Sequence, residues 1–128
     1  MGPARTNDQL YLIHNVTRGI TLATHVALAG TSEARRRGLL DAENLEAGAG
    51  LWIVPCEAIH TFGMKIRLDI VFLDKNFQVR KISADLGPWR MSICLRAHSV
   101  LELPAGAVAR SGTQLGDRLE KRHRSADD

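Results

Sequence analysis

The sequence predicts a single, mainly β domain that folds as a compact two-sheet sandwich with one short α-helix. Short segments in which apolar and polar residues alternate recur along the chain, and glycine- and proline-containing turns separate them. The chain has 128 residues, of which 45% are apolar. This length suits one domain with a core that needs neither a metal nor a disulfide to fold.

The first third of the chain predicts two strands and the helix. Residues 10–14 and 20–28 are rich in β-branched residues, and alternate positions of the second segment share one face, which is typical of a half-buried strand. Residues 31–38 (TSEARRRG) combine a capping hydroxyl, an acid in the first turn, arginines in the last turn and a terminal glycine. They predict one short helix. Residues 41–50 are rich in small residues and predict a loop.

The middle of the chain supplies the most apolar strands. Residues 51–55 and 66–74 are predicted strands, and the second becomes apolar on both faces toward its end, as expected of a central strand. A Lys-Asn turn then leads into residues 77–82 and predicts a hairpin. Residues 90–95 and 99–103 are further predicted strands between proline-containing turns.

The last part of the chain predicts the end of the domain. A helical turn around residues 107–110 and a strand near residues 117–120 complete a domain that we expect to span residues 1–120. Residues 121–128 (KRHRSADD) contain only one apolar residue and predict a disordered, basic C-terminal tail.

Charge and apolar content exclude several classes of partner. The net charge of +3 is too small to indicate nucleic-acid binding, and no stacked aromatic pattern predicts a single-strand platform. No apolar run approaches the roughly 20 residues of a membrane span, and the N-terminus lacks the pattern of a signal peptide. We therefore expect a cytoplasmic protein. The sequence does not predict its oligomeric state.

The connection between the two most apolar strands, residues 56–65, is the predicted functional region. Connections between buried strands are common places for a binding site. The leading hypothesis is a non-enzymatic binding module, without a cofactor, for a small ligand or a partner segment. In it, His60 and Asp69 hydrogen-bond the ligand, a basic side chain faces its negative group, and aromatic and thioether groups supply apolar contact. The predicted ligand-binding residues are His60, Phe62, Met64, Lys65, Asp69, Trp89 and Arg90.

An enzyme centred on Cys56 and His60 is the alternative hypothesis. Cys56, His60, Cys94 and His98 have the residue types of a zinc tetrad. In an extended strand, however, residues four apart lie about 13 Å from each other, which disfavours a shared ion. A thiol nucleophile at Cys56, with His60 as base and Asp69 orienting it, is the metal-free version. A disulfide between Cys56 and Cys94 needs an oxidising compartment, for which the sequence has no signal, so the reduced state is favoured. A purely structural role is the third hypothesis.

Three polar features have structural interpretations. Asp69 lies inside an apolar strand and needs a partner if it is buried; Arg67, on the same face, is the simplest one. The arginines at 35–37 point in different directions around a helix, so they predict no phosphate patch. Glu102 faces away from its two leucine neighbours and is expected to face solvent.

Several ordered motifs resemble the bacterial and archaeal family catalogued as domain of unknown function 192. They are ARRRGLL (34–40), PCEAIHTFGMKIRLDIVFLD (55–74), GPWR (87–90), SVLELPAG (99–106) and GTQLGDRL (112–119). The resemblance covers residues 20–120 and implies a compact jelly-roll sandwich, but no reaction and no cofactor. Some family members are secreted. Gly63 stands where many members have a bulky aromatic residue, which implies a more open loop in this chain.

Overall fold

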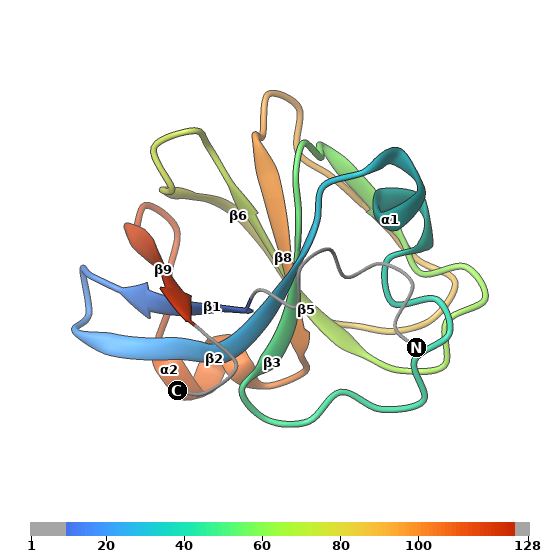
Figure 1. Cartoon of the computed structure of the whole chain (residues 1–128), viewed down its shortest axis with the longest axis horizontal. Helices are drawn as coiled ribbons and strands as arrows, with labels where there is room; N and C mark the ends of the chain where they lie inside the picture. The colour runs from blue at the N-terminus through green and yellow to red at the C-terminus, as the bar shows by residue number, and fades with distance from the viewer. Residues whose placement is uncertain (1–9, 125–128) are drawn as a thin grey trace.

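The computed structural model describes residues 10–124 and confirms the mainly β, two-sheet class (Figure 1). The elements in chain order are β1 (Leu10–Asn15), β2 (Ile20–Ala29), α1 (Ser32–Arg37), β3 (Ala49–Ile53), β4 (Ala58–His60), β5 (Leu68–Leu73), β6 (Val79–Leu86), β7 (Met91–Ile93), β8 (Ser99–Pro104), α2 (Ala107–Ser111) and β9 (Leu119–Arg124). Within this range neither helix has the length and apolar character needed to cross a bilayer.

Seven strands form the main sheet, in the order β6-β5-β8-β3-β2-β1-β9. Every neighbouring pair is antiparallel except β2 and β3, which run parallel. The sheet curls strongly, because a bridge between Gln78 and Arg118 brings the start of β6 against the start of β9. Apolar side chains from all seven strands and from α2 consequently meet on the inner face of the curl.

The parallel pair explains where α1 lies. Two parallel strands cannot be joined by a tight hairpin, so the chain between β2 and β3 must cross over one face of the sheet. Residues 30–48 make this crossing, and α1 is its helical part. Ala34 of α1 packs against Leu51 and Ile53 of β3, which places the helix over the outer face of the sheet.

The second sheet contains only β4 and β7, paired antiparallel. An isolated two-stranded sheet is marginally stable in water, so this one depends on what it packs against. Ile59 of β4 belongs to an apolar cluster with Leu68, Ile70 and Phe72 of β5. The small sheet therefore covers the outer face of the main sheet beside α1.

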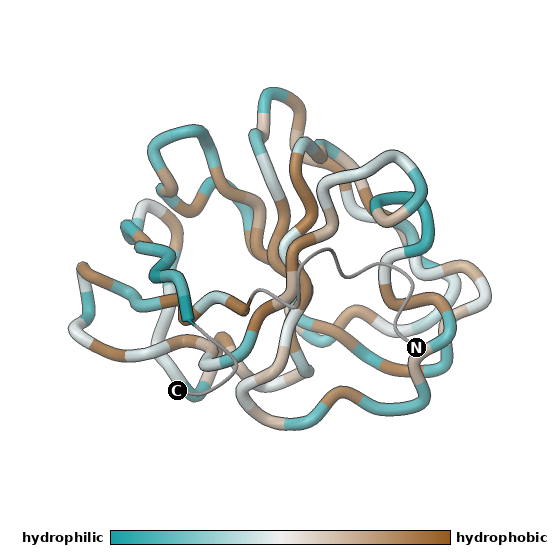
Figure 2. The backbone as a smooth tube through the Cα atoms, in the orientation of Figure 1, coloured by the Kyte–Doolittle hydropathy of each residue, from teal (hydrophilic) through white to brown (hydrophobic). Residues whose placement is uncertain are grey.

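Strand β5 shows how the sequence divides the core. All six of its residues are buried. Ile70 and Phe72 belong to the outer cluster, whereas Val71 and Leu73 belong to the inner one, as the period of two predicts. Figure 2 shows apolar residues concentrated along the central strands and polar residues in the outer loops. A central strand that is buried on both faces is the axis of the fold.

One prediction about the C-terminal part is confirmed and one needs correction. The helical turn expected around residues 107–110 is the short helix α2. Residues 121–124, assigned from the sequence to the disordered tail, lie in β9 and pair with β1. The strand is stabilised by this ladder and by Lys121, whose Nζ lies 5.7 Å from the ring centre of Tyr11 and 5.3 Å from that of Trp52. Residues 125–128 are outside the described residues.

Candidate functional site

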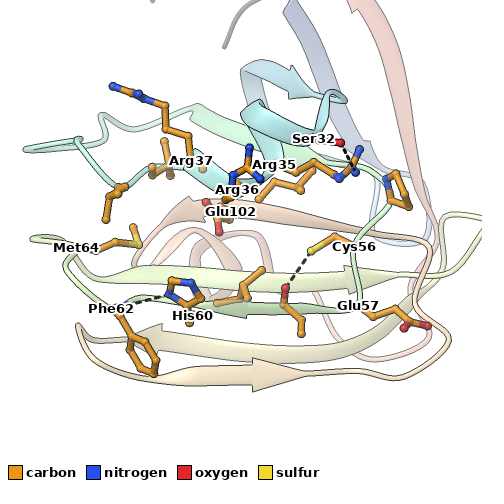
Figure 3. A pocket seen from close by; sticks show the side chains of 17 residues that line it. Ser32, Arg35, Arg36, Arg37, Cys56, Glu57, His60, Phe62, Met64 and Glu102 are labelled. Carbon is orange, nitrogen blue, oxygen red and sulfur yellow. Dashed lines mark hydrogen bonds between the residues drawn. The ribbon is translucent and has the colours of Figure 1, made fainter. Parts of the chain in front are cut away.

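A cleft of about 560 Å³ opens between α1 and the segment that contains Cys56 and β4. Figure 3 looks into this cleft, with the arginines of α1 on one wall and Cys56 and His60 on the facing wall. Leu39, Ile59 and Met64 contribute apolar surface. This volume falls within the range of small-molecule sites in proteins.

Local sequence signals position the α1 wall. The hydroxyl of Thr31 accepts the Ala34 N–H at 3.1 Å and caps the start of the helix. Gly38 ends it with a φ of 50°, a conformation that favours glycine. A Cβ built on Gly38 would lie 3.7 Å from Oε1 of Glu102, so the end of α1 is directly above that side chain.

The three consecutive arginines of α1 have different surroundings. Arg35 donates to the Gly30 carbonyl at 2.8 Å and reaches the Ser32 hydroxyl. Arg37 pairs with Asp41, one helical turn later. Arg36 also lines the cleft, and within the described part of the chain it makes no hydrogen bond or ion pair. The cleft therefore has one guanidinium group whose donors are available.

Glu102 of β8 forms the buried part of the cleft. Its neighbours on the adjacent strands are Leu51 of β3 and Ile70 of β5, so the side chain projects from an apolar stretch of the sheet. It is 4% exposed, and its Oε1 has no hydrogen-bond partner among the described atoms. Burial disfavours the ionised form and raises the pKa of Glu102 from 4.5 to about 7. At neutral pH this carboxyl group can therefore donate or accept a proton.

The expectation that Glu102 faces solvent is wrong. The alternation along β8 was read correctly, because Leu101 and Leu103 belong to the inner core and Glu102 points to the opposite face. What the pattern could not show is that the crossing segment with α1 covers this face. A charged residue inside the apolar run SVLELP was the signal that could have identified it.

The opposite wall contains the thiol and the imidazole of the enzyme hypothesis. Burial raises the pKa of the Cys56 thiol above its ordinary value, and Sγ–H donates to the Ala58 carbonyl at 3.2 Å. Burial is the larger influence and keeps a proton on Cys56 at neutral pH, although the hydrogen bond to the Ala58 backbone acts in the opposite direction on the pKa. Nδ1 of His60 accepts the Phe62 N–H at 3.3 Å, which leaves Nε2 as the protonated nitrogen of the neutral ring.

Aromatic rings continue from the edge of the cleft to the outer surface. The Phe62 ring stacks on His60 at 4.8 Å and on Trp89 at 5.7 Å between ring centres. The buried residue Thr61 holds the two loops together: its hydroxyl donates to the Gly87 carbonyl and accepts the N–H of Arg90. His60, Phe62 and Met64 line the cleft, whereas Trp89 reaches it only through the stacked rings.

Lys65 and Arg90, two other predicted site residues, do not line the cleft. Lys65 lies 3.6 Å from Glu43, and both side chains are well exposed. Arg90 is exposed at the surface, and its backbone N–H bonds to Thr61. Neither of these basic side chains is therefore part of the cleft that His60 and Met64 line.

Asp69 lies away from the cleft as well. It is 1% exposed, and its carboxylate accepts three backbone N–H groups: Asp85 on Oδ1, and Gly106 and Val108 on Oδ2. The last two belong to the first turn of α2. Arg67, the partner expected from the sequence, instead pairs with Asp85 at 2.7 Å. Asp69 therefore anchors α2 to β5 and is not among the residues that line the cleft with His60 and Met64.

The four residues of the zinc hypothesis do not assemble a metal site. Among residues 10–124 no group of three or more histidine, cysteine or acidic side chains is arranged to hold a metal ion. Cys56 and Cys94 are free thiols, so the structure contains no disulfide between them. The cleft thus combines a buried acid, an available guanidinium, a protonated thiol and an apolar surface.

The chain is similar to proteins without an established activity. The model of domain of unknown function 192, described as "Uncharacterized ACR", matches residues 13–121. A UPF0127 protein of Pyrococcus horikoshii is 30% identical over 115 residues, which cover 85% of this chain and 97% of the relative. A UPF0127 protein of Pyrococcus furiosus is 29% identical over 112 residues, covering 83% and 94%.

Two crystal structures share the fold. A protein of unknown function from Novosphingobium aromaticivorans has a TM-score of 0.75 and 24% identity, covering 87% of this chain and 83% of its own. A protein from Sinorhizobium meliloti, described as a candidate transcription regulator, has a TM-score of 0.75 and 25% identity, covering 88% and 92%. The first likeness supports the fold alone.

Proposed function

Because that family model matches most of the chain, this protein belongs to the family of domain of unknown function 192, and we propose that it is a non-enzymatic binding module for a small ligand. The ligand occupies the cleft between α1 and β4. Glu102 and Arg36 supply its polar contacts. His60, Phe62 and Met64, which the sequence pattern also indicated, supply a ring edge and apolar contact.

The unpartnered carboxyl group of Glu102 carries this proposal. A buried polar atom without a hydrogen bond lowers the stability of the fold by about 1–3 kcal/mol, so such atoms in native proteins call for an explanation. Glu102 is not isolated inside the core but lines a cleft of ligand size. A bound molecule with a hydrogen-bond donor would give Oε1 the partner that the chain itself does not provide.

The thiol chemistry of the alternative hypothesis receives less support. A nucleophilic cysteine needs a lowered thiol pKa and a base that is itself oriented by a third group. The Cys56 pKa is raised, and Asp69 is committed to α2 rather than to His60. Binding through Glu102 and Arg36 needs neither an activated thiol nor a resident metal.

Ligand-observed NMR with a panel of small charged and apolar metabolites tests the proposal. We expect a subset to bind, and to shift backbone resonances of α1 and β4. Arg36→Ala should weaken binding by about tenfold or more, because a charge-assisted hydrogen bond contributes roughly 1.5–3 kcal/mol. Glu102→Gln should also weaken binding while preserving the shape of the side chain.

Arg80→Ala is the matched control. Arg80 is exposed on β6 and does not line the cleft, so this variant makes the same charge change at a distance from it. Binding that is unchanged in the Arg36 and Glu102 variants would contradict the proposed site. A panel in which no molecule shifts the α1 and β4 resonances would contradict small-ligand binding itself.

A further inference from the structure

The buried carboxyl group of Glu102 is complementary to a hydrogen-bond donor that carries a positive charge. Glu102 lies against Leu51 and Ile70, and within the described residues no cation is close enough to pair with it. A carboxylate that is buried without a cation is strongly disfavoured, whereas one that meets an ammonium group gains a charge-assisted hydrogen bond. A ligand amine at Glu102 would supply both the charge and the donor.

The α1 wall is positively charged and is complementary to an anion. Arg35 and Arg37 are held by Gly30, Ser32 and Asp41, but they still place positive charge beside the opening. Arg36 keeps its planar set of donors available, and this geometry matches a carboxylate through two parallel hydrogen bonds. A molecule with only an amine would be repelled by this wall, and one with only an anion would meet the acid below.

Apolar surface lines the same cleft as these two polar groups. Leu39, Ile59 and Met64 line the same cleft, and the thioether of Met64 can adapt to branched hydrocarbon. The volume of about 560 Å³ leaves room for a molecule of amino-acid size. The cleft thus combines a buried acid, a guanidinium on the helix side and an apolar lining.

We propose that the ligand is an amino-acid-like zwitterion with an apolar side chain, whose ammonium group meets Glu102 and whose carboxylate meets Arg36. This inference rests on the proposed function, because it concerns the same cleft. Each charged end of such a molecule meets the complementary group, and its side chain contacts the apolar lining. A neutral or singly charged molecule leaves one of the two groups without a partner.

A comparison of L-leucine with its two truncated analogues tests the ligand class. The first analogue, 4-methylpentanoate, lacks the amine, and the second, 3-methylbutylamine, lacks the carboxylate. Measured by ligand-observed NMR on the full chain, leucine should bind at least about tenfold more tightly than either analogue. Glu102→Gln should remove the preference over 4-methylpentanoate, and Arg36→Ala the preference over 3-methylbutylamine. Arg80→Ala should leave both preferences unchanged.

The outcomes separate this inference from the proposed function. If 4-methylpentanoate or 3-methylbutylamine binds in the cleft as tightly as leucine, the zwitterion is overturned and the binding module stands. The absence of leucine binding at millimolar concentration also overturns the ligand class. If leucine binds with unchanged affinity to both the Glu102→Gln and the Arg36→Ala proteins, the cleft is not the site and both proposals fail.

Discussion

The two faces of the main sheet treat a buried carboxyl group in opposite ways. Near α2, Asp69 accepts three backbone N–H groups, and Asp117 accepts hydrogen bonds from Asn15 and Arg18. On the outer face, under α1, Glu102 is as deeply buried and lies only one register position from Asp69 in the β5–β8 ladder, but it has an oxygen without a partner. Asp69 and Asp117 hold loops and a helix in place. Glu102 has an oxygen that remains available to accept a hydrogen bond from a molecule in the cleft.

This difference distinguishes structural acids from candidate site residues better than burial alone. A buried carboxylate that receives several donors stabilises the fold, whereas one without partners destabilises it. Natural proteins tend to break local rules of this kind at functional sites. Substituting the two kinds of acid should therefore have opposite consequences for stability.

The largest effect is expected at Asp69. Asp69→Ala should lower the free energy of unfolding by about 3–5 kcal/mol, because it leaves several buried backbone N–H groups without an acceptor. Urea denaturation measures this loss. Asp69→Asn, which retains one acceptor oxygen, should lose less. A loss below about 1 kcal/mol for the alanine variant would remove the distinction between the two faces of the sheet.

At Glu102 the effect is smaller and depends on pH. The folded state raises the pKa from 4.5 to about 7, so it holds a proton that the unfolded chain releases. The stability contribution is therefore fully present below pH 4.5 and is lost as the pH rises through 7. Each pH unit in that window is worth about 1.4 kcal/mol, so the loss approaches ~3 kcal/mol.

Glu102→Gln isolates this effect because glutamine does not titrate. As the pH rises from 5 to 8, the unfolding free energy of the variant should increase relative to that of the original protein. The Cys56 thiol keeps its proton in both proteins over this range, because burial raises its pKa. Parallel stability curves for the two proteins would show that Glu102 is not held in an unfavourable environment.

The sequence predicted what depends on local alternation. In β5, the period of two correctly separated Ile70 and Phe72 from Val71 and Leu73, because neighbouring side chains of a strand point to opposite faces. It also assigned Glu102 to the correct face of β8. Those assignments depend only on the alternation of apolar and polar residues within one strand, which can be read directly from the sequence.

The sequence did not reveal what lies across each face. Whether Glu102 meets water or a helix depends on the crossing from β2 to β3, which is a property of the whole topology. The partners of Asp69 are backbone N–H groups 16 to 39 residues away, and every residue except proline offers such a group. Arg67 was the expected partner because side chains, unlike backbone donors, are visible in a sequence.

The smallest expected effect concerns Asp117 and has the opposite pH dependence to that of Glu102. The Arg18 hydrogen bond, followed by those from Asn15 and Gln114, lowers the pKa of Asp117 from 3.8 to about 2 against the opposing effect of burial. Its contribution is present above pH 3.8 and is lost as the pH falls toward 2. Because Arg18 is partly exposed, we expect a loss of about 1–2 kcal/mol after solvent screening.

Acid denaturation of the Asp117→Asn variant measures this contribution. Asparagine cannot ionise, so the variant should be less stable than the original protein at pH 6 and should approach its stability near pH 2. With the Glu102→Gln comparison, the two buried acids would then give stability differences of opposite slope in separate pH windows. A constant difference between the original protein and Asp117→Asn from pH 6 to pH 2 would mean that the Arg18 contact does not distinguish the ionised from the protonated acid. The contrast between the two faces of the sheet would then rest on the backbone hydrogen bonds of Asp69 alone.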